Sequence, residues 1–166
     1  MIKRIDPSEF TLAAELIRAS FLTVADDLGF TEQNCPRYIG FVISAERLRT
    51  QYGWGWQILG LYVDEQLVGY ASISNEGEGA YEFHNIAVLP EFRHRGYGKQ
   101  LVDFCVDTVA ASGGNRVNIS IVEENTVLKD WYTEYGFVHT GTSKYEHLLF
   151  TVGSMVLDVS GVHRGK

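Results

Sequence analysis

The densest group of residues that could carry out chemistry lies between residues 88 and 99. Gly96 and Gly98 carry no Cβ, so the backbone at these positions can bend and approach a ligand closely. A helix is expected to begin at Gly96, and the free N–H groups at the start of a helix attract anions. The same segment contains three basic side chains, those of Arg93, Arg95 and Lys99. Together these features are typical of a diphosphate site, and the alternative is a solvated basic turn.

Other ligand motifs do not fit this segment. A dinucleotide-binding fingerprint would need a third glycine where Leu101 stands, and a P-loop would need serine or threonine where Gln100 stands. The five histidines form no H-E-x-x-H pattern, and no C-x-x-C pair accompanies them. The sequence therefore predicts no metal site.

The elements that must position this segment follow from hydrophobic periodicity and turn residues, which predict the order β-α-α-β-β-β-α-β-α-β-β. Strands are expected at residues 1–5, 57–63, 67–74, 81–89, 116–122, 137–142 and 148–159. Helices are expected from residues 6–9 to Gly29, and at residues 37–51, 96–112 and 126–135. The order indicates an α/β fold with a mixed, mostly antiparallel central sheet and helices on both faces.

Composition limits the class of protein. A chain of 166 residues suffices for one hydrophobic core, so a single domain over residues 1–166 is expected. The net charge of −7 argues against nucleic acid and anionic membranes as partners. No apolar run approaches the roughly 20 residues of a membrane-spanning helix, and the first residues lack the apolar segment of a signal peptide. A cytoplasmic protein is expected, with Cys35 and Cys105 as free thiols.

Three segments resemble parts of the GCN5-related N-acetyltransferase (GNAT) family. Arg93-His94-Arg95-Gly96-Tyr97-Gly98 is similar to the family's pyrophosphate loop, Q/R-x-x-G-x-G/A. Residues 125–137 are similar to the family's N-x-x-A-x-x-x-Y-x-x-x-G-F helix and depart from it only at Leu128. Residues 29–36 are similar to a segment of an uncharacterised bacterial branch of the family. The resemblance implies a GNAT-like fold and acetyl-CoA as co-substrate.

The resemblance also implies where acetyl-CoA binds. Its candidate contacts are Ile86, Ala87, Val88, Arg93, His94, Arg95, Gly96, Tyr97, Gly98, Lys99 and Asn125. Val88 is expected to hold the pantetheine arm through its backbone. The Asn125 side chain suits the amides of that arm, and it suits equally the N-cap of the following helix.

Acetylation of an amine needs a base and an acid. By resemblance Glu82 is the candidate base, and His84 is the rival because imidazole titrates nearer neutral pH. The period-two rule places both on one strand face with Ile86. The resemblance likewise implies that Tyr132 is the acid, since its offset from Asn125 is the one at which the family places that residue; packing against the sheet is the alternative.

The resulting hypothesis is an acetyl-CoA-dependent N-acetyltransferase in which a primary amine of a small molecule or peptide attacks directly within a ternary complex. Two alternatives stay open: a non-catalytic acyl-CoA-binding or regulatory module, and a transferase for another acyl group. The aromatic residues Tyr52, Trp54 and Trp56 could line the amine pocket or only pack. A homodimer could form through the last strands.

Overall fold

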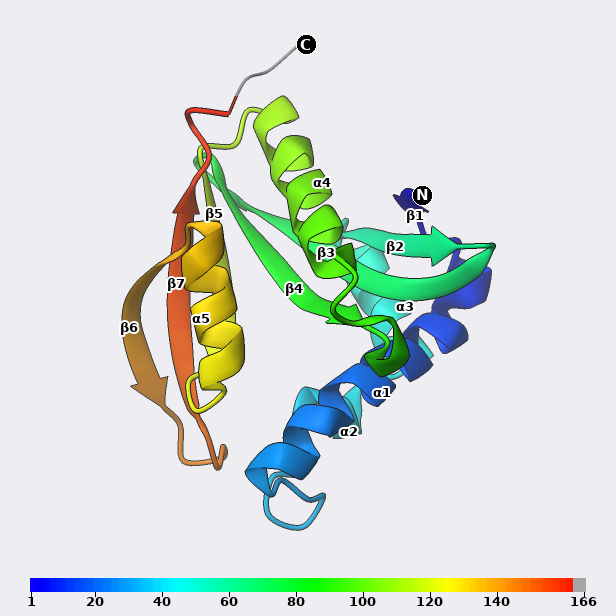
Figure 1. Cartoon of the computed structure of the whole chain (residues 1–166), viewed down its shortest axis with the longest axis vertical. Helices are drawn as coiled ribbons and strands as arrows, with labels where there is room; N and C mark the ends of the chain where they lie inside the picture. The colour runs from blue at the N-terminus through cyan, green and yellow to red at the C-terminus, as the bar shows by residue number, and fades with distance from the viewer. Residues whose placement is uncertain (163–166) are drawn as a thin grey trace.

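The computed structural model describes residues 1–162 as helices packed on one twisted sheet (Figure 1). The strands are β1 (Ile2–Arg4), β2 (Gln57–Val63), β3 (Gln66–Gly77), β4 (Ala80–Val88), β5 (Arg116–Val122), β6 (Val138–Lys144) and β7 (Thr151–Asp158). The α-helices are α1 (Phe10–Leu28), α2 (Ile39–Val42), α3 (Ala45–Gly53), α4 (Tyr97–Ala111) and α5 (Thr126–Tyr135). Short 3₁₀ turns at Pro7–Glu9 and Pro90–Phe92 precede α1 and α4.

Within the described residues the sheet has seven strands in the order β1-β2-β3-β4-β5-β7-β6. Every neighbouring pair is antiparallel except β4 and β5, which are parallel. Residues of α4 pack on one face of the sheet, and residues of α1 and α3 pack on the other. The predicted α/β architecture is confirmed. The last strand, β7, lies inside the sheet, so β6 forms the outer edge on that side.

The two helical layers are held by apolar stripes. On α4, Leu101, Cys105 and Val109 are fully buried, as their four-residue spacing predicts. On α1 the helical spacing of apolar residues from Leu12 through Ile17 predicts a buried stripe; Ile17 is buried, but Leu12 is 47% exposed. The buried face of α1 instead begins at Phe10 and continues through the alanines of the next turn.

Two predicted elements differ from the structure. The helix expected at residues 37–51 is divided into α2 and α3, because Ser44 is extended and its side chain accepts a hydrogen bond from the Arg47 N–H, which caps α3. The last strand begins at Thr151 rather than Leu148. Both cysteines are buried free thiols, as expected. Among the described residues, no helix has the length and apolar character needed to cross a membrane.

Strands β4 and β5 pair over only a short stretch. Residues 80–82 pair with residues 116–118, and beyond that point the strands diverge (Figure 1). Near the same point β4 contains a β-bulge: Ser72 pairs with His84 and Tyr70 with Ala87, so β4 has one residue more than β3. Asn85, within the bulge, has a positive φ of 53°. The opening and the bulge together shape the site described next.

Candidate active site

A cleft of about 770 Å³ lies where β4 and β5 diverge. Residues 85–88 of β4 form one wall, and residues 119–122 of β5 form the other. The loop before α4, part of α5 and part of α1 also line it, together with residues 37–39 and with Leu148, Phe150 and Val152. Ile86, Ala87 and Val88, the strand residues predicted to contact the cofactor, therefore all line one cavity.

The loop at one end of the cleft has the backbone of an anion-binding site. His94 and Gly96 have positive φ values of 62° and 82°, and α4 begins at the next residue, Tyr97. Left-handed residues of this kind turn neighbouring N–H groups toward a common concave side, which favours phosphate. The first N–H groups of α4 add to them. The loop can therefore bind a diphosphate through its backbone.

The basic side chains of this loop are already paired with protein groups. The Arg93 guanidinium donates to the Ser20 carbonyl, the Ser20 hydroxyl and the Thr23 hydroxyl, each at 3.0 Å, and so ties the loop to α1. Arg95 donates to the Glu91 carbonyl at 3.1 Å. Lys99 forms an ion pair with Asp103 at 2.7 Å. The three cations that suggested a diphosphate site thus have other partners, and the backbone N–H groups carry the geometric case for anion binding.

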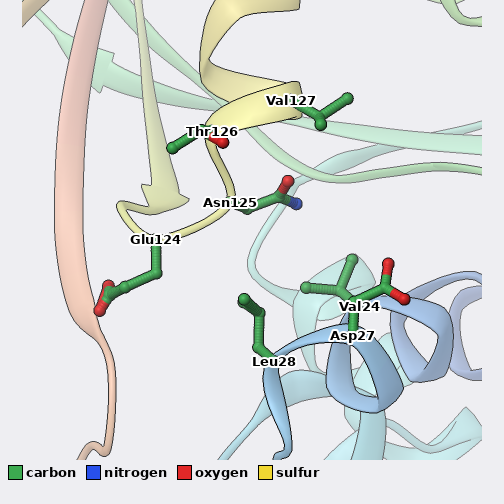
Figure 2. A pocket seen from close by; sticks show the side chains of 7 residues that line it. All are labelled: Val24, Asp27, Leu28, Glu124, Asn125, Thr126 and Val127. Carbon is green, nitrogen blue, oxygen red and sulfur yellow. The ribbon is translucent and has the colours of Figure 1, made fainter.

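Asn125 lies where the cleft meets a smaller pocket of about 160 Å³ (Figure 2). Its side chain accepts a hydrogen bond from the Leu128 N–H at 3.3 Å, which confirms the predicted N-cap of α5. Asp27, from the end of α1, lines both cavities. The Glu124 carboxylate turns toward β7, where it accepts from the Thr151 N–H. The predicted contact of Asn125 with the pantetheine arm stays a prediction.

Tyr132 lies in the cleft wall and is only 6% exposed. Among the described residues its hydroxyl has no hydrogen-bond partner, whereas the Tyr135 hydroxyl donates to Asp103 at 2.5 Å. Burial raises the pKa of Tyr132 above its usual range, so the phenol keeps its proton at neutral pH. Tyr132 can therefore serve as a proton donor to a group bound in the cleft.

Glu82 and His84 lie together on the sheet face that packs against α1 and α3. The His84 Nε2 is 4.0 Å from a Glu82 carboxylate oxygen. The prediction that Ile86 shares this face is wrong, because the bulge at Asn85 interrupts the alternation and Ile86 packs against the α4 core. Neither Glu82 nor His84 lines the cleft wall itself, although Phe83 and Asn85 on either side of His84 do.

Burial changes the titration of both candidate bases. It lowers the pKa of His84 from 6.5 to about 4, with the nearby Glu76 acting in the opposite direction. Burial, with a further contribution from Glu76, raises the pKa of Glu82. At neutral pH the imidazole is therefore uncharged and can accept a proton.

Three residues near His84 were missed by sequence reasoning or were left undecided. Trp56 stacks on the imidazole with ring centroids 4.0 Å apart and planes 12° apart. The Ser74 hydroxyl donates to Glu76 at 2.5 Å and lies 2.8 Å from the His84 Nε2. We call Trp56, Ser74, Glu76, Glu82 and His84 the hairpin cluster. The sequence left open whether Trp56 lines a pocket or only packs, and in the structure it stacks on the candidate base His84.

The hairpin cluster is also where a cation could be held. Donor atoms of Glu76, Glu82 and His84 lie within 4.8 Å of one another, in a combination that many divalent metals accept. Each of these groups is only partly buried or exposed, and His84 already has Ser74 as a partner. The expectation of no metal site stays a prediction.

Comparison with known proteins identifies the fold and the family. The sequence pattern of the acetyltransferase (GNAT) family matches residues 23–137. The structure is similar to PaiA N-acetyltransferase from Thermoplasma acidophilum in complex with coenzyme A, with TM-score 0.81, 19% identity and coverage of 95% of this chain and 98% of that one. It is also similar to ribosomal-protein-S18-alanine N-acetyltransferase from Escherichia coli, with TM-score 0.77, 14% identity and coverage of 98% and 96%.

A curated relative, GCN5-related N-acetyltransferase 6, chloroplastic, from Arabidopsis thaliana, is 29% identical over 80 residues. That match covers 48% of this chain and 28% of the length of the relative. The family match is longer and contains both segments that resemble GNAT motifs, residues 93–98 and 125–137. This chain therefore belongs to the acetyltransferase (GNAT) family.

Proposed function

We propose that the protein is an acetyl-CoA-dependent N-acetyltransferase acting on a primary amine of a small molecule or peptide. One observation carries this proposal: the cleft between β4 and β5 has an anion-binding backbone loop at one end and a buried phenol in its wall. A long, narrow ligand with a diphosphate at one end and a reactive group at the other suits this arrangement. Membership of the family and the coenzyme A complex of a structural neighbour support it.

Acetyl-CoA, when bound, supplies an acetyl thioester that an unprotonated amine can attack directly. The backbone of residues 93–98 would hold its diphosphate, and the backbone of Val88 would hold its pantetheine arm. Asn125 lies close enough to the same cavity to contact the amides of the arm. These contacts fix the position of the thioester relative to the side chains of the chain.

Proton transfer is assigned to two places. Glu82 or His84 accepts the proton of the ammonium form of the substrate: the raised pKa of Glu82 strengthens it as a base, and His84 is an uncharged imidazole with a free lone pair, which its lowered pKa makes the weaker base of the two in energy terms. Because neither lines the cleft wall, a water molecule would carry the proton to them. The Tyr132 hydroxyl, which keeps its proton, donates it to the leaving thiolate sulfur.

The test has two stages. Calorimetry with acetyl-CoA measures binding, and release of free coenzyme A is then followed with polyamines, amino sugars, aminoglycosides, amino acids and peptide N-termini. We expect binding, and release with at least one amine class. Binding without release for any amine would indicate a non-catalytic acyl-CoA-binding module. Faster release from propionyl- or succinyl-CoA would indicate another acyl group, and absence of binding would overturn the proposal.

A further inference from the structure

The Ser74 hydroxyl occupies a position between two acceptors. It has one hydrogen, which it donates to the Glu76 carboxylate at 2.5 Å. The His84 Nε2 lies 2.8 Å from the same oxygen. Because the hydroxyl hydrogen is already used, the contact with Ser74 is made only if Nε2 carries a hydrogen and donates it. The lone pair of a neutral imidazole then resides on Nδ1.

We infer that Ser74 and Glu76 are positioning residues that hold His84 in its Nε2–H tautomer, which makes Nδ1 the atom that accepts the proton of the amine. This inference rests on the proposed function and decides between its two candidate bases in favour of His84. The arrangement orients a histidine through a serine and a carboxylate, both contributed by β3.

Other contacts restrain the same ring. Trp56, the residue just before β2, stacks on one face of the imidazole, with an interplanar angle of 12°. The Ser72 hydroxyl donates to the His84 carbonyl at 3.2 Å and so holds the backbone beneath the ring. The His84 side chain is 20% exposed. A ring that is stacked, hydrogen-bonded and mostly buried keeps its orientation, so the tautomer is set by the partner of Nε2.

The proton step balances as follows. An N–H bond of the protonated amine, an ammonium group, breaks, directly or through one water molecule; a bond forms between that proton and Nδ1, and the electron pair stays on the nitrogen of the now neutral amine for its attack. His84 becomes an imidazolium, which later loses the Nδ1 proton to water. The charged groups facing the ring are Glu82 at 4.0 Å, from the same strand, and Glu76 through Ser74. The Glu76 charge and the face of Trp56 favour the cation, against the larger effect of burial, which lowers the pKa of His84.

The tautomer can be measured without any substrate. Long-range ¹H–¹⁵N correlation spectra of the full chain distinguish Nε2–H from Nδ1–H imidazole, and His84→Gln identifies the signal. We expect the Nε2–H form in the wild type and a mixture of both forms in Ser74→Ala. An Nδ1–H wild type, or a Ser74→Ala spectrum unchanged at His84, would overturn the inference whether or not the enzyme turns over.

A second measurement separates positioning from a purely structural role. Glu76→Gln should lower the midpoint of the His84 titration by about one unit and kcat by about 10-fold, with the KM for the amine nearly unchanged. Glu78→Gln is the matched control, since it removes one exposed carboxylate from the same hairpin and should change neither value. Unchanged kcat in Glu76→Gln would overturn the inference. A wild type that shows the Nε2–H form, binds acetyl-CoA and never releases coenzyme A would instead contradict the proposed function, and with it the proton-accepting role of Nδ1.

Discussion

The loop before α4 and the hairpin cluster differ in which atoms are free to act. At the loop before α4, all three basic side chains are hydrogen-bonded to protein groups, and the left-handed residues His94 and Gly96 give the backbone a conformation that favours anion binding. In the hairpin cluster the side chains themselves are the chemical groups. Among residues 1–162, the only ion-pair contact of Glu76 or Glu82 is the one between Glu82 and His84.

This difference separates binding from chemistry. A site made of backbone groups depends on conformation, and its side chains matter through the shape that they stabilise. A site made of titratable side chains depends on local charge and burial, and one atom changed there alters the reaction. Substitutions in the loop should therefore change the affinity for acetyl-CoA, whereas substitutions in the hairpin cluster should change the rate or its pH dependence.

The largest expected effect is on the rate of the chemical step. Tyr132→Phe removes the proton donor and should lower kcat by about 1000-fold, with little change in the Kd for acetyl-CoA. Tyr135→Phe is the matched control on the same helix, because its hydroxyl pairs with Asp103 and faces no proposed chemistry. Steady-state kinetics and calorimetry measure both quantities. Equal losses of kcat in the two variants would remove the acid role of Tyr132.

The next effect is on stability. The pKa of His84 is lowered to about 4 in the folded protein, so between that value and 6.5 the unfolded chain binds a proton that the folded chain does not. The free energy of unfolding therefore falls as the pH drops through this window, by at most about 3 kcal/mol from this group. His84→Gln should remove this part of the pH dependence, measured by urea unfolding at pH 7 and pH 4.5. The exposed His147→Gln should retain it, and an equal slope in both variants would contradict the assignment.

A smaller effect is expected where Arg93 joins the loop to α1. Arg93→Ala removes three hydrogen bonds and should lower the free energy of unfolding by about 2 kcal/mol and raise the Kd for acetyl-CoA by about 10-fold. Arg93→Lys keeps the charge and loses the planar fork of donors. If the loop conformation that Arg93 stabilises matters more than its charge, the lysine variant binds acetyl-CoA about as weakly as the alanine variant. Full affinity in Arg93→Lys would show that charge is what binds.

The smallest effect is expected at the exposed cations. Arg95→Ala and Lys99→Ala should each raise the Kd for acetyl-CoA by less than about 3-fold, because exposed charges are screened and both already have partners. Calorimetry at low and physiological salt checks this. A change above about 10-fold in either variant would mean that these side chains leave their partners to bind the cofactor. The loop would then act through its side chains, as the hairpin cluster does.

The sequence predicted those elements whose first and last residues are recognisable capping or turn residues. Residues 116–122 alternate strictly enough for a strand, and α5 extends from the N-cap Asn125 to Gly136, as expected. The division of residues 37–51 into α2 and α3 depends on two extended residues, Ile43 and Ser44, within an otherwise helical pattern. The partners of Arg93 could not be predicted, because Ser20 and Thr23 are about 70 residues away in the sequence.

The hairpin cluster could not be predicted from the turn alone. A two-residue turn at Glu78 and Gly79 would, without a register shift, place Ser74 opposite Phe83. A register shift between Asn75 and Gly77 instead pairs Ser74 with Glu82 and Ser72 with His84. The bulge at Asn85 is hidden in the same way: an alternating pattern contains no sign of an inserted residue, so the face of Ile86 was predicted wrongly.

The short pairing of β4 and β5 also has a thermodynamic consequence. Three residue pairs join the two halves of the sheet, and past them the facing backbone edges of β4 and β5 diverge. A ligand that touches both edges bridges the two halves of the sheet beyond their three residue pairs, and it binds only the folded state. Linkage then makes the melting temperature follow the concentration of that ligand, with a gain of about 2.7 kcal/mol at a free concentration of about 100 times Kd. The same opening that admits the co-substrate would couple the stability of this protein to its supply.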